Sequence, residues 1–297
     1  MTPGLTLGTA NFGLAYGIAN NRMLSEGEAF AILERAGELG VSSVDTARGY
    51  GDAEKVLGTF FARHGKLFEI VSKLPDGEYR TADDVRKQVD ASLENLRVER
   101  IDALLLHSFR AFQRFKDILL PVLEGYVSSG ALGGYGLSVY HPYEVETALR
   151  AGFRITTVQF PLNFFDQRFL KGGYVQQFAA AGIRLYARSI FLQGLFFMDG
   201  AGLGNHFEQA RPKLKHLASM ARLHGTSIEA LALLFALNSG VDNVVLGVDS
   251  VEQLEKNVGH ITGSARDLLP RLKQGFDMLE ISDEGIILPF NWKERVP

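Results

Sequence analysis

The chain has 297 residues, of which 46% are hydrophobic and 22% charged, and its formal net charge is −3. This is the composition of a globular protein, and the lack of a lysine- or arginine-rich block argues against nucleic acid as the main partner. The absence of cysteine excludes disulfides, thiolate catalysis and cysteine-ligated metals.

No segment has the pattern of a membrane or export signal. The start, Met1–Phe12, lacks the basic region and continuous apolar core of a signal peptide. The longest apolar stretch, near Ile228–Leu237, is far shorter than the roughly 20 residues that a membrane span needs. We therefore expect a soluble, cytoplasmic protein with no membrane partner.

Short β-rich runs alternate along the chain with longer segments of helical period. Several runs, such as Ile101–Leu106, are almost wholly apolar, as is typical of parallel strands covered on both faces. The eight strands that we expect are Leu5–Thr9, Val41–Thr46, Phe68–Leu74, Asp102–His107, Gly134–Ser138, Thr156–Phe160, Arg184–Ser189 and Asn243–Gly247.

The intervening segments have apolar residues at helical spacing. In the second of them, Thr81 is the expected N-cap because Asp83 and Asp84 follow it. The apolar stripes run over Ala29–Leu39 (ending in Gly40), Val85–Leu96, Phe112–Val122 and Pro142–Ala151, and further helices are expected over Gln209–His224, Ser227–Asn238, Ser250–His260 and Ala265–Glu280.

Eightfold alternation of strand and helix predicts an α/β protein with a single (β/α)8 TIM-barrel domain over residues 1–297 and a C-terminal tail from about 281 to 297. A doubly wound open sheet is the rival fold, but it usually carries a glycine fingerprint after its first strand. The segment Gly8–Gly13 has phosphate-loop spacing without the Lys-Ser/Thr that such a loop needs.

Reactive groups in such barrels lie at the carboxyl ends of the strands, around one mouth. Asp45, Lys73 and His107 end the second, third and fourth expected strands, and Tyr50 lies in the loop after the second. Each has an ordinary structural explanation as a cap, a solvated strand end, a core histidine or a packed aromatic. Their position on neighbouring strands favours a single site instead.

These four residue types suit the reduction of a carbonyl group. A carbonyl that accepts a hydride needs a proton donor within hydrogen-bond reach. A tyrosine has a reference pKa of about 10, and a neighbouring ammonium such as Lys73 favours its phenolate. Asp45 would keep Lys73 charged, and His107 would direct the carbonyl oxygen by hydrogen bonding.

The stretch Asp45-Thr-Ala-Arg-Gly-Tyr50-Gly-Asp-Ala-Glu54-Lys-Val-Leu57-Gly58 resembles the second-strand signature of aldo-keto reductases. The order Asp45, Tyr50, Lys73, His107 resembles the catalytic tetrad of that family, and the resemblance runs from Leu5 to about Asn257. It implies a (β/α)8 barrel, hydride transfer between a nicotinamide cofactor and an aldehyde, ketone or alcohol, Tyr50 as proton donor, and no metal.

The resemblance also implies a cofactor site. Ser138 and Gln159 would hold the nicotinamide carboxamide, although Val139 stands where the family usually has Asn. Arg188 replaces an aromatic that stacks on the nicotinamide ring, and a planar guanidinium can also stack. The residues implied to bind the cofactor are Gly8, Thr9, Ser138, Gln159, Arg188, Ser189, Ile190, Phe191, Gln193, Gly194, Gly247, Asp249, Gln253 and Asn257.

The identity of the dinucleotide depends on the end of the site after the last strand. Many members of the family bind the 2′-phosphate of NADP(H) near the position of Asp249, with basic or hydroxyl side chains. NADP(H) is therefore the first expectation from the resemblance. NAD(H) is the second, because Asp249 would repel that phosphate and could instead accept from a ribose hydroxyl. Lys256 is a candidate to compensate for Asp249.

The substrate is less constrained by the sequence. Arg48 lies between Asp45 and Tyr50 and is a candidate to bind a carboxylate, phosphate or acidic sugar; a solvent-facing loop arginine is the alternative. The other pocket candidates are Phe12, Tyr16, Tyr140 and Trp292. We expect a small carbonyl substrate, with sugar-like and anionic compounds both open, and a monomer or small homo-oligomer.

Three rival functions are weighed against this prediction. One is a regulatory or sensor subunit that binds the cofactor with little turnover, against which the complete set of four residues argues. Another is a Schiff-base aldolase with Lys73 as nucleophile. A metal-dependent hydrolase is disfavoured, because the 7 histidines show no His-x-His or His-Glu-x-x-His spacing.

Overall fold

The structure is a computed structural model that describes residues 4–16, 22–198, 203–262 and 275–292. Its eight strands form a closed barrel in chain order, and every neighbouring pair is parallel. The strands are β1 (Gly4–Gly8), β2 (Ser43–Asp45), β3 (Glu69–Leu74), β4 (Ala103–Leu106), β5 (Tyr135–Ser138), β6 (Thr157–Pro161), β7 (Arg184–Arg188) and β8 (Asn243–Gly247). The predicted (β/α)8 barrel is confirmed.

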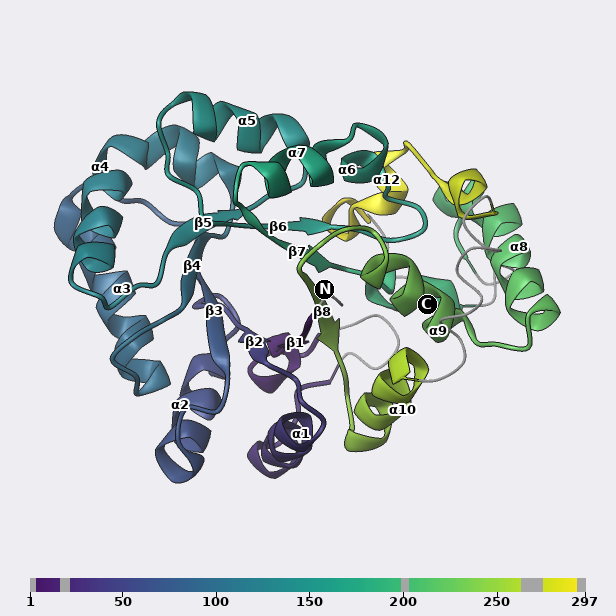
Figure 1. Ribbon diagram of the computed structural model, residues 1–297, viewed down its shortest axis with the longest axis horizontal. Coiled ribbons are helices and arrows are strands. Elements are labelled where there is room, and N and C mark those ends of the chain that lie inside the picture. Colours follow the sequence, from purple (N-terminus) through teal and green to yellow (C-terminus); the bar gives the residue numbers. More distant parts are fainter. Residues whose placement is uncertain (1–3, 17–21, 199–202, 263–274, 293–297) are drawn as a thin grey trace.

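Helices surround the strands, as Figure 1 shows for α1 to α5. The α-helices are α1 (Glu26–Glu38), α2 (Ala53–His64), α3 (Ala82–Leu96), α4 (Phe109–Ser128), α5 (Pro142–Arg150), α6 (Arg168–Lys171), α7 (Tyr174–Ala180), α8 (Ala210–Leu223), α9 (Ile228–Leu237), α10 (Val251–Thr262) and α12 (Glu284–Ile287). Short 3-10 helices are η1 (Ala10–Phe12), η2 (Leu192–Phe197), η4 (Asn205–Phe207), η6 (Asp277–Leu279) and η7 (Pro289–Asn291).

Helix α2 is absent from the sequence-based expectations. Gly58 lies in its middle, and glycine lowers helix propensity by about 1 kcal/mol. A Cβ at Gly58 would lie 1.9 Å from the backbone oxygen of Asn95 on α3, so close packing of the two helices requires a glycine there. The short helices α6 and α7 were also not predicted.

The predicted helix ends agree better with the structure. Thr81 is the N-cap of α3, where its side chain accepts from the backbone N–H of Asp84. Gly40 follows α1 in the left-handed region, with φ of 78°. Of the helix expected over Ala265–Glu280, residues 263–274 lie outside the described residues, and the rest contains only η6.

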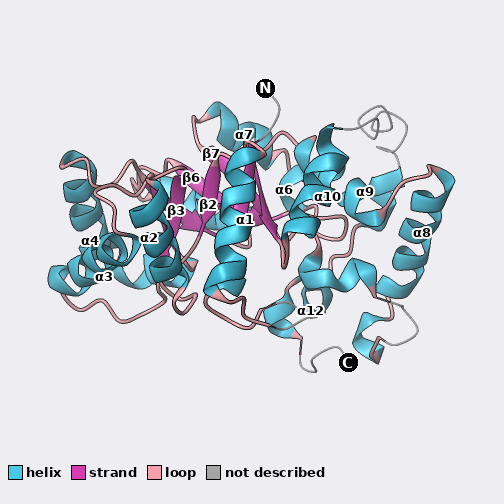
Figure 2. Cartoon of the chain, turned by 90° about the horizontal axis from the view of Figure 1, so that it is seen from below, coloured by secondary structure: helices cyan, strands magenta, loops and turns pink. Residues whose placement is uncertain are grey.

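The apolar residues form a main core between the strands and the helices, and an outer cluster on one side of the barrel. The outer cluster comprises Phe164, Phe165, Leu192, Leu195, Phe196, Leu203, Phe207, Ala210, Leu214, Leu217, Met220, Ala221, Leu231, Ala232, Phe276, Leu279, Ile281, Ile286, Ile287 and Leu288. Helix α8, which belongs to this cluster, lies away from the barrel strands in both Figure 1 and Figure 2. The cluster attaches the segment after residue 275 to the barrel.

The described helices were compared with the length and hydropathy that a membrane-spanning helix needs. Within the parts of the chain that the structure describes, no single helix is long and apolar enough to cross a membrane. Helices α8 and α9 reach that length and hydropathy only as a pair bent by 95°.

Candidate active site

The pleat of the strands brings the reactive side chains to the barrel interior. Val71 and Leu105 belong to a small apolar cluster inside the barrel. Because alternate residues of a strand face the same side, Lys73 and His107, each two residues further on, face the interior as well. Apolar residues therefore fill the barrel below, and polar residues gather where the strands end.

Lys73 is held by Asp45 in a buried ion pair. The side chains are 1% and 5% exposed, and Lys73 Nζ lies 2.6 and 2.7 Å from the two carboxylate oxygens of Asp45. Nζ also donates to the backbone oxygen of Thr46 at 3.0 Å. Three close acceptors match the three N–H donors of an ammonium, whereas a neutral amine has only two. This geometry corresponds to a charged lysine.

Tyr50 lies beside this pair. Lys73 Nζ is 3.5 Å from the Tyr50 hydroxyl oxygen and 5.1 Å from the centre of its ring. Burial raises the pKa of the Tyr50 hydroxyl and the charge of Asp45 raises it further, while Arg188 opposes them. Burial and the charge of Asp45 outweigh the lowering of this pKa that we expected from Lys73. Tyr50 is therefore held in its protonated form, the form that donates a proton.

Close backbone packing fixes the loop that carries Tyr50. A Cβ at Gly13 would lie 2.0 Å from the backbone oxygen of Tyr50, and one at Gly51 would lie 2.2 Å from the backbone oxygen of Gly13. Gly51 also has φ of 58°, in the left-handed region. The loop after β1 and the loop after β2 can approach this closely only with glycine at both positions.

His107 completes the group of four. Its ring lies edge-on to that of Tyr50, with ring centres 5.7 Å apart. Burial lowers the pKa of His107 to about 4, with further lowering by Lys73 and Arg188. At neutral pH the imidazole is therefore uncharged and offers one N–H donor.

Gln159 connects these residues to the rest of the site. Its amide nitrogen donates to Asp45 Oδ1 at 2.6 Å, while its amide oxygen is buried and, among the described residues, has no hydrogen-bond partner. A buried acceptor without a donor is costly unless a ligand supplies one. The amide group of a nicotinamide carboxamide is a donor of the right kind, so this position fits the cofactor.

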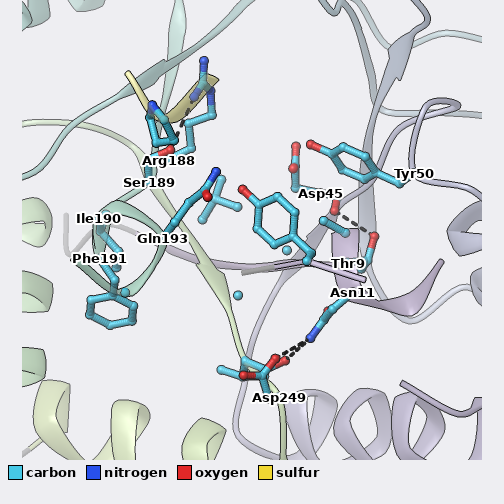
Figure 3. A pocket seen from close by; sticks show the side chains of 18 of the residues that line it. Thr9, Asn11, Asp45, Tyr50, Arg188, Ser189, Ile190, Phe191, Gln193 and Asp249 are labelled. Carbon is cyan, nitrogen blue, oxygen red and sulfur yellow. Dashed lines mark hydrogen bonds between the residues drawn. The ribbon is translucent and has the colours of Figure 1, made fainter. Parts of the chain in front are cut away.

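A single cavity of about 660 Å³ joins all these groups. Every catalytic and cofactor-binding residue expected from the sequence lines it, from Tyr50 and His107 to Asp249 just before α10 and Asn257 within that helix. Figure 3 shows Arg188, Ser189, Ile190 and Phe191 on one side of the cavity in this view, with Asp45, Tyr50 and Thr9 on the other. Its lining residues are Gly8, Thr9, Ala10, Asn11, Tyr16, Asp45, Tyr50, Lys73, His107, Ser138, Tyr140, Gln159, Arg188, Ser189, Ile190, Phe191, Gln193, Gly194, Phe197, Glu229, Val245, Gly247, Val248, Asp249, Gln253, Lys256, Asn257, Pro289 and Phe290.

The expected substrate-pocket residues are only partly among them. Tyr16 and Tyr140 line the cavity, but Phe12 and Trp292 do not. Phe12 is 2% exposed and packs in the main core. Trp292 packs against the outer cluster and donates from its indole N–H to the backbone oxygen of Ile286. Both aromatics serve packing, which is the commoner use of such residues.

Arg48 also lies away from the cavity lining. Its guanidinium is 3.4 Å from Glu54, whose side chain is 1% exposed and also accepts from the hydroxyl of Ser72. Arg48 thus faces a buried carboxylate rather than the cavity. Its guanidinium charge compensates the buried carboxylate of Glu54.

Several lining residues carry no signal in the sequence. Asn11 donates to the backbone oxygen of Val248 at 2.7 Å and to Asp249 Oδ1 at 3.0 Å, linking the first and last strand ends (Figure 3). Pro289 and Phe290 enter from η7, more than 200 residues away in sequence from Asn11. Pro289 and Phe290 are identified only by the folded position of η7 beside the cavity. The sequence indicated no more than that an aromatic residue of the tail could reach the pocket.

Comparisons with known proteins agree with this geometry. A model of the Aldo/keto reductase family matches residues 4–264. An L-galactose dehydrogenase from Arabidopsis thaliana is 26% identical over 259 residues, which cover 80% of this chain and 79% of the relative. A D-threo-aldose 1-dehydrogenase from a Pseudomonas species is 26% identical over 297 residues, covering 86% and 88%.

A solved structure supports the fold. An aldo-keto reductase from Bacillus halodurans, in its holo form, is similar with a TM-score of 0.76 at 19% identity, covering 95% of this chain and 93% of that one. The family match spans nearly all of the barrel and includes the four residues at its mouth. The chain therefore belongs to the Aldo/keto reductase family and is an NAD(P)H-dependent carbonyl oxidoreductase.

Proposed function

We propose that Asp45, Tyr50, Lys73 and His107 carry out the carbonyl chemistry, with Tyr50 as proton donor. The single observation that carries this proposal is the contact of a fully paired Lys73 ammonium with the Tyr50 hydroxyl, 3.5 Å away. A bound nicotinamide cofactor supplies the hydride in reduction and accepts it in oxidation.

The four residues have separate parts in reduction. The uncharged His107 donates its N–H to the carbonyl oxygen and fixes its position. Tyr50 gives its proton to that oxygen as negative charge develops there. The Lys73 ammonium stabilises the phenolate that Tyr50 becomes, and Asp45 keeps Lys73 charged and oriented.

The residues at the α10 end support NAD(H) rather than NADP(H) as the preferred cofactor. Asp249 and Glu229 line that end of the cavity, and Lys256 is paired with Glu229 at 2.8 Å. The nearby Arg22, which donates to the backbone oxygen of Asp249, is paired with Glu28 at 2.8 Å. A 2′-phosphate would have to displace a carboxylate from either cation and lie near Asp249.

The substrate is a small carbonyl compound or the corresponding alcohol. The relatives include enzymes named for L-galactose and for D-threo-aldoses. We therefore place the substrate in the size range of an aldose, in line with a cavity of about 660 Å³ that also has to hold the cofactor.

The rival functions fit the site less well. A Schiff-base aldolase needs a neutral amine, but the Nζ of Lys73 is surrounded by three close acceptors, an arrangement that suits an ammonium. A sensor without turnover has no use for a buried proton donor beside a lysine.

The test is a fluorescence titration of the protein with NADH and with NADPH, followed by turnover of a panel of aldehydes and aldoses. We expect submillimolar binding of both cofactors, tighter for NADH, and cofactor-dependent turnover. Dissociation constants above about 1 mM for both, equivalent to about −4 kcal/mol, would contradict the proposal. Borohydride trapping of Lys73 with a keto substrate would then support the aldolase.

A further inference from the structure

Arg188 is a cation of the cavity that the carbonyl chemistry does not use. It ends β7 and is partly buried, and its guanidinium lies 4.5 Å from the centre of the Tyr140 ring. Its hydrogen bonds are long: 3.3 Å to the backbone oxygen of Val139 and 3.4 Å to the hydroxyl of Ser189. Both acceptors are uncharged.

The other cations near the mouth all have carboxylate partners. Lys73 is paired with Asp45, Lys256 with Glu229, and Arg48 with Glu54. No ion pair joins Arg188 to any of the described residues. A partly desolvated charge without a counter-ion costs stability, so its presence in a ligand cavity indicates that a ligand supplies the counter-ion.

Arg188 is close enough to His107 and Tyr50 for its charge to affect their pKa values. Its charge contributes to lowering the pKa of His107, after burial and Lys73, and it opposes the rise in the pKa of Tyr50. Figure 3 shows Arg188 across the cavity from Tyr50. Tyr140, over which Arg188 lies, also contacts Phe290, and both aromatic residues line the cavity.

We propose that Arg188 binds the acidic group of an anionic substrate whose carbonyl group lies at Tyr50. The planar guanidinium, kept in orientation by Tyr140, presents a fork of N–H donors that matches a carboxylate or a phosphate. This inference rests on the proposed function for the carbonyl end of the substrate, but binding of the anion does not depend on turnover. The anion-binding role that the sequence suggested for Arg48 is therefore assigned to Arg188.

The test compares acids with their neutral amides. Succinic semialdehyde and a carboxylated benzaldehyde are assayed beside their amides with the wild-type chain, Arg188→Gln and Arg188→Lys. Because a charged hydrogen bond is lost, kcat/KM for the acids falls by about 10- to 100-fold in Arg188→Gln. The amides lose less than the acids, so the acid-to-amide ratio falls, and Arg188→Lys keeps part of the preference for the acids.

Arg184→Gln is the matched control. Arg184 begins the same strand, and its side chain is half exposed and paired with Glu69 at the other end of the barrel. This variant keeps the acid-to-amide ratio of the wild type. Equal turnover of acids and amides by the wild type, or an equal loss for both in Arg188→Gln, overturns the inference.

Two binding measurements separate the possible sources of the anion. Dissociation constants for NADH and NADPH are measured with Arg188→Gln; if they weaken while the acid-to-amide ratio stays constant, the guanidinium serves the cofactor and the inference is wrong. Calorimetry with succinate and succinamide tests the anion site without turnover. Succinate binding that depends on Arg188 upholds the inference even where no hydride transfer is found, and succinate binding that is equal in the wild type and Arg188→Gln overturns it.

Discussion

The two sides of the barrel mouth differ in whether their charged side chains have ion-pair partners and in how their loop backbones are held. On the side of β2 to β4, the catalytic side, Lys73 and Asp45 are paired and buried and glycines lock the Tyr50 loop in place. On the side of β7, the recognition side, Arg188 has no ion pair among the described residues, and Ser189 and Gln193 have φ of 60° and 53°. The difference indicates that the chemical groups are pre-organised, while recognition is completed by ligands.

The largest expected effect breaks the catalytic side at its proton donor. In Tyr50→Phe, kcat for aldehyde reduction falls by about 10²- to 10⁴-fold, because the hydroxyl that donates the proton is lost. Dissociation constants for the cofactor stay unchanged. Tyr143→Phe, at an exposed tyrosine 54% accessible and outside the cavity lining, is the matched control. Comparable loss of kcat in both variants would contradict the assignment.

The next effect is on stability. Lys73→Met leaves the buried Asp45 carboxylate without its counter-ion and lowers the free energy of unfolding by about 3–5 kcal/mol. The double variant with Asp45→Asn loses less, because the uncompensated charge is gone. Urea denaturation measures both. A double variant less stable than Lys73→Met would show that the ion pair is not the cause.

A pH effect of intermediate size comes from His107. Its pKa is about 4 in the folded chain and about 6.5 in the unfolded chain, so only the unfolded chain binds this proton in the window between them. Stability therefore falls as the pH drops through that window, by about 2 kcal/mol from about pH 7 to about pH 5. Denaturation at both pH values measures it. In His107→Gln this part of the dependence disappears; an unchanged dependence would exclude His107 as its source.

The smallest effect concerns cofactor choice at the α10 end of the cavity. Asp249→Asn removes a negative charge and keeps the oxygen that accepts from Asn11. NADPH binding is expected to strengthen by about fivefold, or about 1 kcal/mol, with NADH binding nearly constant. Fluorescence titration measures both. A wild-type chain that already prefers NADPH more than tenfold would contradict the assignment of NAD(H).

The sequence was sufficient for the barrel and for the catalytic side because both depend on local patterns. Strand–helix alternation predicts the fold, and alternate-residue periodicity places Lys73 and His107 inside. Helix α2 was missed because its glycine, needed for contact with Asn95, resembles a helix breaker.

The recognition side could not be predicted in the same way. Whether an arginine is paired depends on residues brought together by folding, so Arg48 and Arg188 look alike in the sequence. Only the structure shows that Glu54 engages Arg48, and that Asn11 joins Asp249 across the barrel. The aromatic that reaches the cavity from the tail is Phe290 rather than Trp292, since Trp292 packs inward on Ile286.

The most direct test of the central claim is a single turnover with NADH deuterated at the transferring position of its nicotinamide, using an aldehyde that the chain reduces. Mass spectrometry of the alcohol follows the label. We predict that the deuterium appears on the carbinol carbon of the product with the wild-type chain, and that Tyr50→Phe slows this transfer without changing where the label goes. An unlabelled product, or transfer at wild-type rate in Tyr50→Phe, would contradict hydride transfer in this cavity with Tyr50 as proton donor.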